Sequence, residues 1–187
     1  MDTRIKTSKT IKLPEWVRDI DLGRIDLTSE SARMAFVVNL AIRNVEAGTG
    51  GPFAAAVYDK QRKKLVSIGV NVVETGGTSI AHAEIMAIML AQEQNHEFRL
   101  SSPDLELVSS AQPCAMCYGA VFWSGIKSVI YGADKIDVQT ITGFDEGPLP
   151  ENWTTELGNR GITIKQVDRQ AACKVLQLYH DQQGTIY

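Results

Sequence analysis

The chain has 187 residues, of which 44% are hydrophobic and 22% charged, a balance typical of a single globular domain. Its formal net charge is −3, from 19 Lys and Arg against 22 Asp and Glu, and this argues against a nucleic-acid-binding function. No apolar run approaches the ~20 residues of a membrane span, which argues against a membrane protein.

The first 27 residues are polar and irregular, and we expect them to form an arm before a folded domain of residues 28–187. They lack the apolar core of roughly 7–15 residues that a secretory signal contains. The three cysteines are an odd number, which favours a reducing compartment over a disulfide framework. We therefore expect a cytoplasmic protein.

The stretch DLTSESARMAFVVNLAIRNVEAGTGG (26–51) predicts a helix, because Thr28 or Ser29 can cap its start. One apolar stripe supports this helix, formed by Met34, Val37, Val38, Ala41 and Val45. The near-continuous apolar run PFAAAVYD (52–59) is typical of a strand buried on both faces. The stretch KLVSIGVNVV (64–73) can pair back with it as a hairpin.

A second helix is predicted in SIAHAEIMAIMLAQEQN (79–95), which is rich in Ala, Met and Glu. The remaining predicted elements, in chain order, are the strand DLELVSS (104–110), the helix CAMCYGAVFWSG (114–125), the strand KSVIYGA (127–133), the strand GITIKQV (161–167) and a final helix with Ala172, Val175, Leu176 and Tyr179 on one face.

This order of elements predicts an α/β sandwich, in which the strands at 104–110 and 127–132 are joined by a helix as a parallel crossover. In open α/β sheets, ligands bind beyond the carboxyl ends of strands, where the following helices begin. The segments AHAE (81–84) and QPCAMC (112–117) both stand at such helix starts. We therefore expect a functional site there.

Cys114 and Cys117 lie three residues apart on a first helical turn, so their thiols point the same way, and the helix N-terminus favours thiolates. Two small core residues, or a redox pair of the thioredoxin type, would show the same spacing. His82 supplies a third donor, and three protein ligands leave a position for water, as catalytic zinc requires. Glu84 can reach that water as an acid and base.

His82-Ala83-Glu84 and Pro113-Cys114-Ala115-Met116-Cys117 together match the H-x-E…P-C-x-x-C signature of zinc deaminases. Over roughly residues 30–185 the chain resembles the cytidine deaminase-like superfamily. Within that superfamily it is most similar to the guanine deaminases, particularly the bacterial type that also accepts ammeline. The stretches that carry this closer resemblance are GGPFAAAV (50–57), AHAEIMAI (81–88), SAQPCAMCYGAVFWSG (110–125) and GFDEGPLPENW (143–153).

The resemblance implies a three-layer α/β/α sandwich with a mixed central sheet of about five strands and one Zn²⁺ per chain, held by His82, Cys114, Cys117 and a water. It also implies hydrolytic deamination of guanine to xanthine and ammonia, in which zinc-bound hydroxide attacks C2 and Glu84 shuttles the proton. Glu146 would be a second acid that moves protons at the ring. Without the resemblance, Glu146 would be interpreted as an acidic turn residue.

The residues that the resemblance places at the substrate are Asn71, Phe53, the backbone N–H of Ala83, Asp145 and Tyr187. An amide such as that of Asn71 suits an N–H/C=O edge of a purine, although a strand-end turn would also explain it. Phe53 would pack on the base or in the core, and the C-terminal GTIY would fold over the site. Trp123 and Trp153 are further candidates for the pocket wall, and core packing fits Trp123 better.

The main alternative within the superfamily is a tRNA adenosine deaminase, followed by other nucleobase, nucleoside or aminotriazine deaminases. The net charge, the lack of a basic C-terminal helix and the acidic FDEG loop argue against tRNA. A non-catalytic zinc-binding module is a third alternative, against which Glu84 argues. Because relatives are dimers, some with exchanged C-terminal segments, we expect a homodimer that acts on a small nucleobase, with neither nucleic acid nor membrane as a partner.

Overall fold

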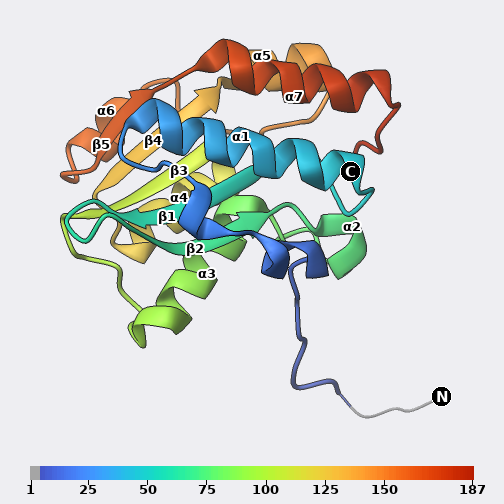
Figure 1. Cartoon of the computed structure of the whole chain (residues 1–187). Helices are drawn as coiled ribbons and strands as arrows, with labels where there is room; N and C mark the ends of the chain where they lie inside the picture. Colours follow the sequence, from blue (N-terminus) through green and yellow to red (C-terminus); the bar gives the residue numbers. More distant parts are fainter. Residues whose placement is uncertain (1–4) are drawn as a thin grey trace.

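A mixed sheet of five strands lies at the centre of the structure, a computed structural model that describes residues 5–187 (Figure 1). The strand order is β2-β1-β3-β4-β5. β1 is antiparallel to both β2 and β3, whereas β3, β4 and β5 are parallel, which confirms the predicted crossover. The strands are β1 (Ala54–Asp59), β2 (Lys64–Val70), β3 (Leu105–Ala111), β4 (Ser128–Ala133) and β5 (Thr163–Gln166).

Helices cover both faces of the sheet, as the three-layer prediction requires (Figure 1). The helices of one layer are α1 (Glu30–Glu46), α5 (Lys135–Thr142) and α7 (Arg169–Asp181). Those of the other are α3 (Ala83–Asn95), α4 (Ala115–Ser124) and α6 (Trp153–Gly158). Along β1, Ala54 and Ala56 enter one core while Ala55 and Val57 enter the other, because neighbouring strand residues point to opposite faces.

The N-cap predicted for α1 and the apolar stripes predicted for α1 and α7 agree with the structure. Ser29 Oγ accepts a hydrogen bond from the Ala32 N–H at 3.0 Å, so Ser29 is the N-cap of α1. The predicted stripes of both helices are buried in the same core. Within residues 5–187, no helix has the length and apolar character of a membrane span.

Hydrophobic periodicity does not predict the shortest helices. They are α2 (Val73–Gly76), α5, α6 and the 3₁₀ helices η1 (Glu15–Asp19) and η2 (Leu22–Arg24). A helix of one or two turns contains too few residues for a 3.6-residue pattern to emerge. For α5 a capping box does mark the start, since the side chains of Asp134 and Asp137 each accept the other's backbone N–H.

Residues 11–27 of the predicted arm pack along the domain, whereas residues 5–10 are exposed. The apolar side chains that contact the core are Ile11, Leu13, Trp16, Val17, Ile20, Ile25 and Leu27. Buried Arg33 donates to the carbonyls of Leu27 and Thr28 and forms an ion pair with Glu106 of β3 at 2.9 Å. Residues 1–4 of the arm lie outside the described part, and a boundary near residue 27 stays a prediction.

An ion pair ties α5 to α7 and gives a pH-dependent prediction. Arg169 donates two hydrogen bonds of 2.7 Å to the Asp137 carboxylate, and these bonds lower the pKa of Asp137 to about 2. The stability that this carboxylate contributes is therefore complete above its unfolded pKa of about 4 and is lost as pH falls through about 2.

Asp137→Asn is expected to lower the unfolding temperature by a few degrees at pH 7, because it removes the ion pair with Arg169. Thermal unfolding of parent and variant between pH 7 and pH 3 should show the difference shrinking below about pH 4. A difference that stays constant over this range would contradict the assignment.

Candidate active site

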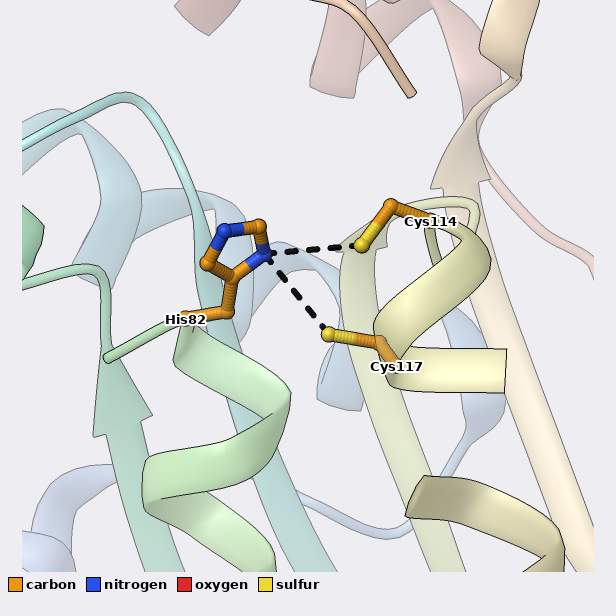
Figure 2. Close-up of side chains that lie close together, drawn as sticks. All are labelled: His82, Cys114 and Cys117. Carbon is orange, nitrogen blue, oxygen red and sulfur yellow. Dashed lines mark hydrogen bonds between the residues drawn. The ribbon is translucent and has the colours of Figure 1, made fainter. Parts of the chain in front are cut away.

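Two helix starts meet at one edge of the sheet. Because β1 runs opposite to its neighbours, the carboxyl ends of β2 and β3 lie at the same edge, and α3 and α4 begin beyond them. His82 is the N-cap of α3 and Cys114 is the N-cap of α4, and neither side chain caps its own helix. Both are therefore free to turn toward one another, as Figure 2 shows.

The three predicted metal donors converge at this edge. His82 Nδ1 lies 3.6 Å from Cys114 Sγ and 3.7 Å from Cys117 Sγ, the contacts dashed in Figure 2. A tetrahedral zinc ion with bonds of about 2.0 Å to nitrogen and 2.3 Å to sulfur places these atoms about 3.6 Å apart. The donor set and its spacing thus fit zinc, and the prediction that these residues can hold one metal ion is confirmed.

Three side chains among the described residues form the group of metal donors. All three ligand atoms lie within 4.8 Å of one another, and among the described residues no fourth His, Cys, Asp or Glu joins them. Cys173, the third cysteine, is on α7 and also a free thiol. A tetrahedral ion here would keep one position for a non-protein ligand, the arrangement that distinguishes catalytic from structural zinc.

A cavity of about 70 Å³ lies against the metal donors. Its walls come from the ends of β1, β2 and β3, the starts of α3 and α4, the loop after α5 and the C-terminus. The lining residues are Phe53, Asn71, His82, Glu84, Ala111, Gln112, Cys114, Phe144, Asp145, Glu146 and Tyr187. Most of the predicted site residues are thus brought together, whereas Ala83 is fully buried at the first residue of α3 and does not line the cavity.

Two buried carboxyl groups face this cavity. Glu84 accepts a hydrogen bond from Ser109 Oγ at 3.3 Å, and burial is the main cause that raises its pKa. Burial, followed by the charges of Cys114 and Glu84, raises the pKa of Glu146 to about 8. A cation held by the three donors would act in the opposite direction on both groups.

The loop that carries Glu146 is fastened to the metal-binding helix. The backbone carbonyl of Glu146 accepts the Ala115 N–H at 3.0 Å, which satisfies one of the free N–H groups in the first turn of α4. Lys135 Nζ donates to the next carbonyl, that of Gly147, at 2.9 Å. These two hydrogen bonds tie the acidic loop to the start of α4, where the two thiols lie, and to Lys135.

Asn71 and Tyr187, which both line the cavity, are joined by a hydrogen bond. The Tyr187 hydroxyl donates to Asn71 Oδ1 at 2.7 Å, and the Val73 N–H donates to the same oxygen at 3.2 Å. Because the amide oxygen is engaged, the NH₂ of Asn71 is the group left for a ligand. Gly51 leaves room for the tail, since a Cβ there would lie 2.2 Å from the Tyr187 hydroxyl oxygen.

The structure differs from the expectations at Trp123 and Trp153, whereas Asp145 borders the cavity. Asp145 is exposed, and its carboxylate accepts the Gly147 N–H at 2.8 Å, so it shapes the turn although it borders the cavity. Trp123 neither packs in the core nor lines the cavity, since 76% of its surface is exposed. Trp153 is buried against Tyr131 outside the cavity.

Three lining residues were not identified from the sequence: Ala111, Gln112 and Phe144. Each stands within a stretch that carries the resemblance, so position next to a motif is the signal that could have found them. Phe144 packs edge-on against both Phe53 (5.4 Å between ring centroids) and Tyr187 (4.9 Å). Three aromatic rings in mutual contact therefore form part of the cavity wall.

Residues 27–133 match the family described as the cytidine and deoxycytidylate deaminase zinc-binding region. The guanine deaminase of Bacillus subtilis is 38% identical over 70% of this chain and 80% of its own length. The solved structure of guanine deaminase from Nitrosomonas europaea is 42% identical, with a TM-score of 0.87 over 95% of this chain and 99% of that one. A tRNA-specific adenosine deaminase of Buchnera aphidicola is 36% identical over 62% of this chain and 72% of its own length.

Proposed function

Because the chain belongs to the cytidine and deoxycytidylate deaminase family, we propose that it is a zinc-dependent hydrolase that converts guanine to xanthine and ammonia. The observation that carries the proposal is the group of His82, Cys114 and Cys117 at the wall of a cavity that also holds two buried carboxyl groups. A purely structural zinc site requires neither a cavity nor buried carboxyl groups beside the metal. A deaminase needs an acid and base beside the metal, the role proposed for Glu84.

A zinc ion held by the three donors would activate a water molecule as a Lewis acid, lowering its pKa to about 7. Glu84 stands two residues after the ligand His82, buried and facing the cavity. It is placed to accept the proton that the attacking water loses and to return it to the departing amine. One carboxyl group serves both steps, because the proton that Glu84 takes from the water is the proton that it gives to the amine.

The remaining lining residues would bind and orient the base. Glu146, a buried carboxyl group that borders the cavity, would donate a proton to a ring nitrogen. The Asn71 NH₂ would donate a hydrogen bond to an acceptor atom of the purine. The backbone N–H of Ala83 would donate another, because Ala83 is the first residue of α3 and stands between two residues that line the cavity, His82 and Glu84. Phe53 would pack on the ring, and Asp145, which borders the cavity, would contact the substrate. Tyr187 would cover the bound base.

Ammonia release by the zinc-loaded chain tests this function. Guanine, ammeline, adenine and cytosine are compared, with and without a chelator, together with a tRNA substrate of adenosine deaminases. We expect turnover of guanine that is lost on chelation and restored by zinc. Turnover of the tRNA alone would favour the adenosine deaminase alternative. One bound zinc per chain with no turnover of any substrate would favour a non-catalytic module.

We also propose a cytoplasmic homodimer. All three cysteines are free thiols, which suits a reducing compartment. The surface of α4 supports self-association, because Trp123 is exposed beside Phe122, with ring centroids 4.5 Å apart. Phe98, 88% exposed, lies close to the end of α4, to which Leu100 is hydrogen-bonded. The tail reaches Asn71 of its own chain, an arrangement that needs no exchange of C-terminal segments.

Trp123→Glu is expected to shift the protein from dimer to monomer, because a carboxylate on this apolar face would be desolvated on association. Light scattering after size exclusion measures the mass of each protein directly. Lys174→Glu, an exposed substitution on the opposite layer, is the matched control and should remain dimeric. A parent chain that is monomeric, or a dimeric Trp123→Glu variant, would contradict the assignment of this face.

A further inference from the structure

We propose that Gln112 determines which substituents a substrate base can carry, by separating the substrate cavity from a second, larger hollow. This inference rests on the proposed deaminase function and deepens it. The Gln112 side chain blocks the space that a substituent on the base would occupy, and so restricts the enzyme to the free base. A shorter side chain at this position would admit bases that carry a neutral group.

Two hollows lie on either side of Gln112. The substrate cavity of about 70 Å³ and a hollow of about 470 Å³ share this residue and, among the described residues, no other. The loop after α5 borders both, because residues 144–146 line the cavity and residues 149–151 line the hollow. The hollow therefore adjoins the cavity where Gln112 stands.

Gln112 is held firmly in this place. Its backbone N–H donates to the Ala133 carbonyl at 2.7 Å, and its side-chain oxygen accepts the Lys135 N–H at 3.2 Å. The residue is only 7% exposed. The backbone and the side-chain oxygen of Gln112 are thus both hydrogen-bonded, and the residue is nearly buried, so the side chain has little room to leave its place beside the cavity.

The side-chain NH₂ of Gln112 faces open space. It has no hydrogen-bond partner within residues 5–187, and no buried side-chain nitrogen or oxygen of these residues is left without one. The NH₂ therefore lies at the surface of the cavity or of the hollow. In either position the NH₂ presents a hydrogen-bond donor to the space that it borders.

The chemistry of the hollow favours a neutral substituent. Ile136, Leu149 and Trp153 provide apolar surface, while the Lys135 ammonium is already bonded to the Gly147 carbonyl. Glu151 adds an exposed negative charge that would repel a phosphate. An alkyl or ribosyl group fits these surroundings, whereas a nucleotide phosphate does not.

The test compares Gln112→Ala, which shortens the side chain, with Gln112→Met, which keeps its length and loses its hydrogen bond to Lys135. The value of kcat/KM is measured for guanine and for guanines that carry a methyl, ethyl or ribosyl group at N7, C8 or N9. We expect Gln112→Ala to raise the ratio of substituted to free guanine at least tenfold for one of these positions. Gln112→Met should leave the ratio near that of the parent.

A ratio that is unchanged in Gln112→Ala across the panel, or raised equally in Gln112→Met, would overturn the inference. Zinc content and thermal unfolding confirm that each variant is folded, and Gln112→Ser replaces the alanine variant if that one does not fold. A parent without guanine turnover would refute the proposed function itself. Guanine turnover with unchanged ratios would refute only the role of Gln112.

Discussion

Glu84→Gln is expected to lose guanine turnover by about 10²–10⁴-fold while it still folds and binds zinc. The glutamine side chain has the same shape, and its amide oxygen can still accept the hydrogen bond that Ser109 gives to Glu84. What it cannot do is take up a proton from water and release it to the amine. The loss should therefore appear in kcat, with zinc content and unfolding temperature close to those of the parent.

The matched control is Glu93→Gln, which changes an exposed glutamate on the same helix α3. Its kcat should equal that of the parent. Steady-state ammonia release, with zinc content measured on the same samples, separates a lost proton carrier from a lost metal. A Glu84→Gln variant whose rate stays within tenfold of the parent would remove the acid and base role.

Cys117→Ala is expected to lose the metal and, with it, stability. Cys117 is fully buried on α4 and His82 is at the start of α3, so an ion held by both joins two helices that are distant in the sequence. Binding to the folded state alone adds about 4 kcal/mol to the free energy of unfolding when free zinc exceeds its Kd 1,000-fold. The variant should forfeit this contribution and unfold at a lower temperature.

Cys173→Ala is the matched control, since it removes the third thiol from α7 without touching the site. Zinc per chain should fall well below one in Cys117→Ala and remain near one in the control. Chelation should lower the unfolding temperature of the parent and control but not that of Cys117→Ala. Unchanged zinc content in Cys117→Ala would refute its assignment as a ligand.

The metal donors were predictable from the sequence because their signals are local. An i, i+3 pair of thiols and an i, i+2 pair of His and Glu each occupy one turn at a helix start. The topology then brings the two turns together, and the order of strands and helices already implied that the turns share one edge of the sheet. The central strand β1 was predictable because its segment is a nearly continuous apolar run.

Other features depend on contacts that no local pattern contains. The hydrogen bond between Tyr187 and Asn71 joins residues 116 positions apart, and only the family resemblance placed the tail near the site. Trp123 belongs to an apolar helix whose sequence suggests burial on all sides. Yet only Cys117, Val121 and Ser124 of α4 are fully buried, and Trp123 is the one exposed residue of this helix. The proposed role of Gln112 in substrate specificity depends on the two hollows that it borders, and no sequence pattern reveals these.

A crystal structure of the zinc-loaded chain, with anomalous data at the zinc edge, tests the central claim most directly. We expect a single strong peak per chain, bonded to His82 Nδ1 and to the sulfurs of Cys114 and Cys117, with one solvent oxygen as the fourth ligand. A peak elsewhere, or an ion whose fourth position is closed by a protein atom, would contradict the account.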